Sequence, residues 1–132
     1  MKAAAFEYTR AQSVDQAVQL LQRHAGSAQI LAGGQSLLAM MNLRLAQPGL
    51  LIDITGITEL KSITVQGDHL RMGALVTHRQ LQQSELVARH APLLAMAVPH
   101  VAHMAIRNAG TIGGSMALAR RAARAHWCAA CR

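Results

Sequence analysis

Apolar residues in the first half of the chain follow two alternating patterns. Three short runs, Ala5–Thr9, Ala28–Leu31 and Leu50–Ile54, have the length and composition of β-strands. We expect the first at a sheet edge and the second in a buried position. Between the runs, Val14–Leu21 and Leu37–Leu45 carry apolar residues at helical spacing. This alternation of strand and helix predicts a small α/β unit with a parallel sheet.

Polar residues mark where the first helix begins and ends. Ser13, followed by Gln16 three residues later, forms a capping-box pattern, and Gly26 is a stop signal. The spacing predicts that this helix buries one apolar stripe, made by Val14, Ala17, Val18 and Leu21.

The pattern changes after residue 56. Ile63–Val65 and Leu70–Met72 flank a polar turn sequence and predict a hairpin. Thr77 with Gln80 forms a second capping box, and Pro92 is placed to begin a later helix. The sequence therefore predicts an α+β chain of two subdomains, 1–56 and 57–119, followed by a basic tail, 120–132.

A glycine pair interrupts the chain between the second strand and the second helix. Gly33 and Gly34 can adopt positive φ and let a ligand approach the backbone, so successive N–H groups can form an anion-binding concavity. Ser36 can cap the helix that follows, whose N-terminus attracts negative charge. An ordinary turn before a core helix remains the alternative, because Gly-Gly-Gln-Ser matches neither the dinucleotide fingerprint nor the P-loop.

A second glycine-rich stretch lies in the other half, at residues 106–115. Gly110, Gly113 and Gly114 permit unusual φ, and short polar side chains offer donors, namely Asn108, Thr111 and Ser115. Two such loops suggest one shared ligand. About three hydrogen bonds to a charged group from one loop, at ~1.5–3 kcal/mol each, would barely offset association costs of ~4–15 kcal/mol, so one loop alone could hardly hold a dinucleotide. Two unrelated surface turns remain the alternative.

Composition and charge narrow the classes of function. The chain has 132 residues, 52% of them hydrophobic, and only Phe6, Tyr8 and Trp127 are aromatic, so it offers no stacking platform for bases. The net charge of +7 comes from the C-terminal part: seven basic residues face six acidic ones up to residue 86, whereas six arginines and no acid follow. We expect a cytoplasmic protein with no membrane span and no nucleic-acid partner. A basic module that binds nucleic acid or a protein through its tail is the alternative function.

Two motifs, in the same order, carry a family resemblance. Ala32-Gly-Gly-Gln-Ser-Leu37 is followed by Asn42-Leu-Arg-Leu-Ala46 and Leu51-Ile-Asp-Ile54, and later by Arg107-Asn-Ala-Gly-Thr-Ile-Gly-Gly-Ser115. This pattern resembles the FAD-binding subunit of molybdenum hydroxylases, which includes the medium subunit of carbon monoxide dehydrogenase and the FAD subunit of xanthine dehydrogenase. The resemblance implies an FAD domain of two subdomains with the flavin between them.

The resemblance also implies which residues hold the cofactor. The first motif would wrap the FAD diphosphate through its backbone amides, and the second would contact FAD with Asn108 supporting it; the implied residues are Ala32, Gly33, Gly34, Gln35, Ser36, Thr111, Ile112, Gly113, Gly114 and Ser115. It implies an FAD-dependent oxidoreductase subunit with two partners, a large subunit with the molybdenum cofactor and a small 2Fe-2S subunit. Electrons would pass from the iron–sulfur clusters to the flavin and on to NAD, quinone or oxygen, so no catalytic dyad or metal ligand is required in this chain.

The chain departs from the family pattern after Ala119. Arg120–Arg132 is rich in arginine, alanine and cysteine, where relatives continue with an acidic, proline-containing segment. The hypothesis is a frameshift or premature end, and such a fragment is expected to be marginally stable alone and to bind FAD weakly or not at all. Cys128 and Cys131 with His126 are half of a zinc site at most, and an accidental origin is favoured.

The other polar and sulfur-containing candidates have simpler interpretations. His100 and His103 are expected to be packed or solvent-facing rather than a ligand pair. Asp53 is expected to sit at a strand end, with a ribose or positioning role as the less favoured alternative. Leucines and methionines at inner positions are expected to fill the core, namely Leu81, Leu86, Met40, Met41, Met72, Met96 and Met104.

Overall fold

The computed structural model describes residues 2–118 and divides the chain into two compact units. The first unit ends at Thr58 and the second begins at Glu59. The architecture is α+β, as the sequence predicts: a parallel sheet with helices comes first, and an antiparallel hairpin with helices follows. Residues 120–132, with His126, Cys128 and Cys131, lie outside the described residues.

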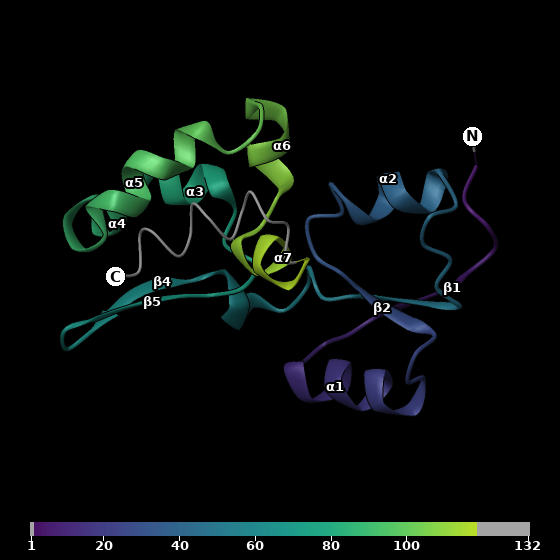
Figure 1. Cartoon of the computed structure of the whole chain (residues 1–132). Helices are drawn as coiled ribbons and strands as arrows, with labels where there is room; N and C mark the ends of the chain where they lie inside the picture. Colours follow the sequence, from purple (N-terminus) through teal and green to yellow (C-terminus); the bar gives the residue numbers. More distant parts are fainter. Residues whose placement is uncertain (1, 119–132) are drawn as a thin grey trace. The chain divides into compact units, whose positions relative to one another are not determined.

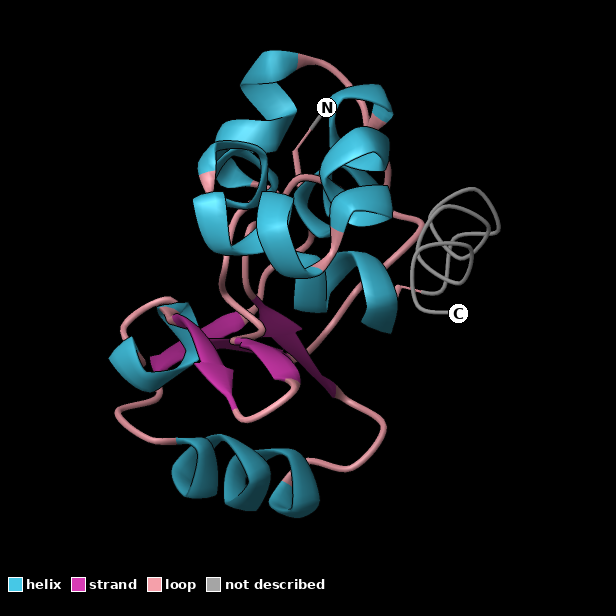
Figure 2. Ribbon diagram, turned by 90° about the vertical axis from the view of Figure 1, so that its left-hand side faces the viewer, coloured by secondary structure: helices cyan, strands magenta, loops and turns pink. Residues whose placement is uncertain are grey.

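A three-stranded parallel sheet forms the centre of the first unit. Its strand order is β1 (Glu7–Arg10), β3 (Leu50–Asp53) and β2 (Ala28–Leu31). Helix α1 (Val14–Arg23) covers one face and α2 (Leu37–Asn42) the other (Figure 1). Figure 2, a view turned by 90°, again shows α1 beside this sheet. The predicted parallel α/β unit is confirmed, with its first strand at an edge.

The central strand β3 carries most of the burial in this sheet. All four of its residues are buried, and Leu51 and Ile52 are among the largest fully buried side chains. Because β3 lies between two parallel neighbours and under helices on both faces, its continuous apolar run fits this position. The expectation of a buried β2 was wrong: three of its residues are half-buried and Gln29 is exposed.

Helix α1 begins as predicted but buries less than its pattern indicates. The Gln16 N–H donates to Ser13 Oγ at 3.2 Å, whereas Gln16 Oε1 accepts from Gln12 N–H at 2.7 Å and not from Ser13. The predicted buried stripe is only partly correct. Ala17 is buried, but Val14 and Val18 remain 38% and 44% exposed. Periodicity therefore identified the apolar face without showing how much of it the unit covers.

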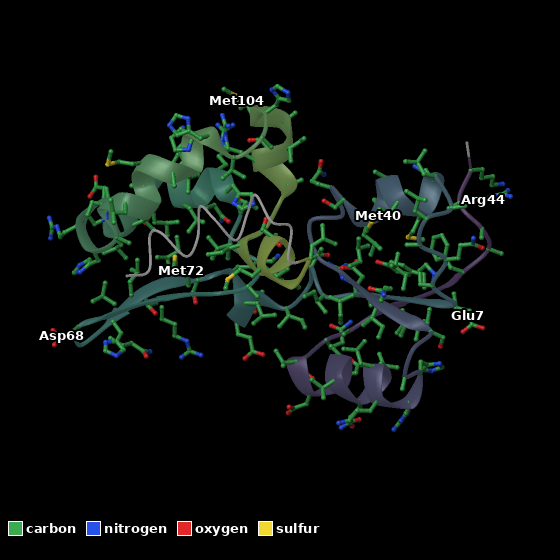
Figure 3. The ribbon with its side chains drawn as sticks, in the orientation of Figure 1. Glu7, Met40, Arg44, Asp68, Met72 and Met104 are labelled. Carbon is green, nitrogen blue, oxygen red and sulfur yellow. The ribbon has the colours of Figure 1, made fainter. Side chains whose placement is uncertain are left out.

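A short 3-10 turn, Thr58–Lys61, spans the boundary between the units, and the predicted hairpin follows it. Strands β4 (Ile63–Gln66) and β5 (His69–Met72) pair antiparallel around a turn in which Gly67 has φ +59°. Asp68 lies at the tip of this hairpin (Figure 3). A positive-φ glycine is what a tight two-residue connection requires.

Short helices fill the rest of the second unit. They are α3 (His78–Gln83), α4 (Glu85–His90), α5 (Pro92–Ala97), the 3-10 turn η2 (Val98–His100), α6 (Met104–Ala109) and α7 (Ile112–Ala117). The capping box at the start of α3 and the proline at the start of α5 are as predicted. Helices α3, α4 and α5 lie over one face of the hairpin (Figure 1), and their core comprises Val76, Leu81, Val87, Leu94, Val98 and Ile112.

Several side chains expected in the core are exposed instead. Leu86 is 38% exposed, Met96 70% and Met104 64%, and Met104 points outward from α6 (Figure 3). Met41 is buried as expected, while Met72 packs partly buried against the core of the second unit. On short helices of six residues, neighbouring positions alone do not determine which side faces the core. In residues 2–118, no helix has the length and apolar character that a membrane crossing demands.

Candidate functional site

The first glycine pair lies in the connection from β2 to α2. Gly34 has φ +69°, and a Cβ there would lie 3.0 Å from Leu38 Cδ1 and 3.2 Å from Leu31 Cδ1. Both the backbone angle and the neighbouring leucines therefore favour glycine. Gly33 is not among the positive-φ residues of the described chain, so only one of the two glycines uses this freedom.

The backbone amides of this connection make no hydrogen bond within the part of the chain that the structure describes. Among the described residues, the N–H groups of Gly33, Gly34, Gln35 and Ser36 donate to no protein acceptor. The Gln35 side chain donates from Nε2 to the Gly33 carbonyl at 3.2 Å, and the connection is half-buried except for Gln35. Consecutive unused N–H groups beside a positive-φ glycine are a concave donor set for an anion. We name residues 32–36 the amide cradle.

Ser36 does not cap the helix that follows the amide cradle. It occupies the N-cap position with φ −102° and ψ −43°, but its side chain makes no cap hydrogen bond. Helix α2 also ends at Asn42, three residues before the predicted end, and Arg44 lies beyond it at φ +56°. The predicted side-chain cap was therefore wrong, and the Ser36 hydroxyl remains outside the helical hydrogen bonding.

The second glycine stretch has a different backbone role. The amides of Ile112 and Gly113 donate to the carbonyls of Val76 and Ala74, each at 2.9 Å. The Gly114 N–H donates to Thr111 Oγ1 at 3.2 Å, and the Ser115 N–H donates to the Thr111 carbonyl at 3.1 Å. The four amides of residues 112–115 are thus all bonded within the second unit, and we name residues 111–115 the hydroxyl segment.

Close packing, not backbone angle, explains the glycines of the hydroxyl segment. No glycine from 110 to 114 has a positive φ in the described chain, which corrects the expectation of unusual angles. A Cβ on Gly113 would lie 2.6 Å from Ala74 Cβ and 2.7 Å from the Ala74 carbonyl oxygen. A Cβ on Gly110 would lie 2.9 Å from the carbonyl oxygen of Ile106. Larger residues at these positions would push the segment away from its support.

One side chain of α3 contacts the hydroxyl segment, and another links α3 to α6. His78 Nε2 lies 2.9 Å from Ser115 Oγ, and Arg79 Nη1 donates to Asn108 Oδ1 at 3.0 Å. Burial, with a smaller contribution from the charge of Arg107, lowers the pKa of His78 below 6.5. Asn108 thus contacts α3, while its expected support of the segment remains a proposal.

Arg107 organises the turn that precedes α6. Its Nη1 donates to the carbonyls of Pro99, Val101 and Ala102 at 2.9, 3.2 and 2.7 Å. Ala102 adopts φ +51°, so the guanidinium contacts a backbone turn that few non-glycine residues form. Sequence reasoning missed His78 and gave no role to Arg107, although Arg107 begins the second motif, because their partners are identified only by the tertiary structure.

Asp53 has a structural role in the first unit. It is 7% exposed, accepts a short hydrogen bond from the Tyr8 hydroxyl, and accepts the Thr55 N–H at 2.7 Å. Burial raises the pKa of Asp53, but the bonds from Tyr8 and Thr55 and the charge of Arg10 lower it more, leaving it below 3.8. The expected position at a strand end is confirmed. Both carboxylate oxygens are engaged by protein donors, which favours a structural role at the strand end over a ribose contact.

No metal centre is formed by the described residues. Within residues 2–118, no three His, Cys, Asp or Glu side chains lie close enough to hold an ion. His100 and His103 are both exposed.

Comparison with known proteins points to one family. The family profile described as "FAD binding domain in molybdopterin dehydrogenase" matches residues 4–130, a range that continues past Ala119, where the sequence analysis placed a departure. The carbon monoxide dehydrogenase medium chain of Hydrogenophaga pseudoflava is 46% identical over 112 residues, covering 85% of this chain and 39% of that protein. The nicotine 6-hydroxylase medium subunit of Paenarthrobacter nicotinovorans is 44% identical, covering 89% of this chain and 41% of that protein.

A solved structure agrees with these relatives. The structure of carbon monoxide dehydrogenase from Hydrogenophaga pseudoflava lacking the Mo-pyranopterin moiety superimposes with a TM-score of 0.86 at 45% identity. The match covers 89% of this chain and 41% of that chain. The chain therefore spans about two fifths of the length of the proteins it matches.

Proposed function

This chain belongs to the family of FAD-binding domains in molybdopterin dehydrogenases, and we propose that the amide cradle binds the FAD diphosphate while the hydroxyl segment makes a second contact with FAD. One observation carries the proposal: the consecutive N–H groups of residues 33–36 have no acceptor in the described protein and lie beside a positive-φ glycine. Such a donor set fits a phosphate oxygen, because a bare backbone can approach it closely.

The two segments contribute in different ways. Each amide of the cradle that donates to a phosphate oxygen contributes about 1.5–3 kcal/mol before the cost of association. The hydroxyl segment adds the side chains of Thr111 and Ser115, since the amides of residues 112–115 are already bonded within their own unit. FAD, when bound, supplies the redox chemistry. The residues of this chain then bind and orient it, and none has to act as a nucleophile or a general base.

The wider role of the chain follows from its family. We propose that it is the flavin subunit of a larger oxidoreductase, receiving electrons from a small 2Fe-2S subunit that is reduced by a large molybdenum subunit. Relatives named as medium subunits support this role, as do their names as dehydrogenases and hydroxylases. The final electron acceptor, as in the family, would be NAD, quinone or oxygen.

A flavin titration tests the cofactor site. The purified chain, alone and with its partner subunits, is titrated with FAD, and binding is followed by the change in flavin fluorescence. Gly34→Ala should weaken binding at least tenfold, because it disturbs the positive-φ position that shapes the cradle.

Gly67→Ala is the matched control. Gly67 also has a positive φ, at +59°, but it lies in the β4–β5 turn and a Cβ there would meet nothing within 4 Å. Both substitutions introduce similar backbone strain of about 1–2 kcal/mol. If both weaken FAD binding equally, or neither does, the amide cradle is not the FAD site.

A further inference from the structure

His78 contacts both ends of the stretch that carries the hydroxyl segment. It is the first residue of α3 and is only 2% exposed. Its backbone N–H donates to the carbonyl of Gly110 at 3.0 Å, and its ring Nε2 lies 2.9 Å from Ser115 Oγ. One residue therefore links the position just before the segment with the last residue of the segment.

The imidazole also fits against the backbone at Gly110. A Cβ on Gly110 would lie 3.2 Å from His78 Cδ2 and 3.7 Å from His78 Nε2. Gly110 has φ −64°, so glycine is needed there for space and not for its backbone angle. The ring consequently holds the segment at a fixed distance from α3.

The charge state of His78 limits the hydrogen bond that it can make. Burial and the positive charge of Arg107 on α6 lower its pKa, and the neighbouring Arg79 on α3 is directed to Asn108. The ring is therefore neutral at neutral pH, with one nitrogen that donates and one that accepts. Either Nε2–H donates to Ser115 Oγ, or the Ser115 hydroxyl donates to Nε2.

The two arrangements present different groups to a cofactor. If Ser115 donates to His78, its hydroxyl offers only lone pairs to other partners. If His78 donates to Ser115, the hydroxyl hydrogen is available to an acceptor. The phosphate and carbonyl oxygens of a flavin nucleotide are acceptors, so only the second arrangement supplies the donor that they need.

We propose that His78 is a positioning residue for FAD, whose Nε2–H donates to Ser115 Oγ and so directs the Ser115 hydroxyl hydrogen to an oxygen of the cofactor. The inference rests on the proposed function, because it requires the hydroxyl segment to contact FAD. It adds to that function a residue outside both glycine motifs and a defined direction for one hydrogen bond.

Nuclear magnetic resonance of the free protein tests the direction of this bond. Long-range proton–nitrogen spectra of the full chain report which ring nitrogen of His78 carries the proton. We expect the Nε2–H form, both before and after FAD is added. The Nδ1–H form would overturn the inference, whether or not the chain binds FAD.

Flavin titrations of four variants test what the bond does. His78→Phe and Ser115→Ala should each weaken FAD binding roughly tenfold, because this is the effect of losing one hydrogen bond to a charged or strongly polar acceptor. Their combination should weaken it no further than either alone. His78→Gln places an amide donor near the position of Nε2 and should bind FAD within about threefold of the wild type. His90→Gln, at an exposed position ending α4, is the control and should bind unchanged.

Thermal unfolding of the same variants separates positioning from stability. If His78→Phe unfolds at a lower temperature but binds FAD like the wild type, His78 is purely structural and the inference is wrong. If His78→Phe does not fold, Ser115→Ala and His78→Gln decide the question. If Ser115→Ala binds normally while Gly34→Ala does not bind, the inference fails and the amide cradle stands. Failure of the wild type to bind FAD, even with its partners, counts instead against the proposed function.

Discussion

The two Gly-Gly segments of this chain have similar sequences and use their glycines for different purposes. In the amide cradle, Gly34 takes a positive φ and the adjacent amides have no acceptor among the described residues. In the hydroxyl segment, Gly113 does not have a positive φ, and its amide donates to the carbonyl of Ala74. Gly113 also packs so closely against Ala74 that there is no room for a Cβ. The same pattern, a glycine pair followed by a polar residue, thus accompanies amides without an acceptor among the described residues in one loop and dense packing in the other.

Because of this difference, replacing a glycine by a larger residue should have different consequences in the two segments. A side chain in the amide cradle should harm binding more than folding, since the connection is only half-buried. A side chain in the hydroxyl segment should harm folding first, since the space is already filled by protein. The predictions below test this division.

The largest effect is expected for Gly113→Ala. The added Cβ would lie 2.6–2.9 Å from atoms of Ala74, including backbone atoms that cannot rotate away. Overpacking of this kind costs about 3 kcal/mol. Urea unfolding of the second unit, followed by its amide resonances, measures the loss.

Gly49→Ala is the control for this substitution. Its added Cβ would lie 3.7 Å from the nearest atom, the carbonyl oxygen of Ser27, which is ordinary contact. We expect a change below about 0.5 kcal/mol for this surface substitution. Equal effects of the two substitutions would show that Gly113 is not required for packing.

Asp53→Asn should destabilise the first unit by about 2 kcal/mol at neutral pH, because hydrogen bonds to a carboxylate become bonds to a neutral amide. The pKa of Asp53 lies below 3.8 in the folded state, so its stabilisation is present above about pH 3.8 and is lost as the pH falls through the folded pKa. The variant should lack this acid-dependent loss.

Denaturant unfolding at a series of pH values, followed by the resonances of the first unit, measures both effects of Asp53→Asn. Tyr8→Phe is the companion variant, since it removes one donor to Asp53 and leaves the bond from Thr55. It should lower stability less than Asp53→Asn. An unchanged pH profile in Asp53→Asn would contradict the assigned role of this carboxylate.

The second unit should lose stability at a higher pH than the first. The pKa of His78 is lowered in the folded state, so the unfolded chain takes up a proton first as the pH falls below 6.5. The stabilisation from the neutral ring is therefore complete above about pH 6.5 and declines until the folded pKa is passed. His78→Gln should remove this decline from the second unit and leave the first unchanged, which unfolding followed by the resonances of each unit would show.

Local rules were enough to predict most of the elements of this fold. The limits of β2, the presence of the β4–β5 hairpin and the N-cap of α3 at Thr77 follow from short-range apolar patterns and from turn and capping residues. The amide cradle could also be located, because its glycine pair interrupts a strand-to-helix transition. Whether Val14 or Leu86 is covered depends on what packs against each helix, and this information is absent from the periodicity.

The contacts that hold the candidate site could not be predicted from the sequence. His78 and Ser115 are separated by 37 positions, and Gly113 is glycine because of Ala74, which lies on a different segment. The three carbonyls that Arg107 contacts come from one irregular turn, whose geometry no motif describes. Sequence motifs therefore located the segments, and only the structure assigned a physical task to each residue within them.

The smallest effect, a stabilising one, is expected for Arg44→Gly in the turn after α2. Arg44 has φ +56°, and this backbone conformation destabilises the folded state of a residue with a Cβ by about 1–2 kcal/mol. Glycine avoids this strain, but its greater freedom in the unfolded chain lowers stability by about 0.5–1 kcal/mol. The net gain should be about 0.5 kcal/mol, seen as a higher urea midpoint with an unchanged slope. Arg44→Ala removes the charge, keeps the strain and should leave the midpoint unchanged. Ala102→Gly, at φ +51° in the second unit, should give a similar gain, and a gain in one unit only would show that the other left-handed residue is not strained.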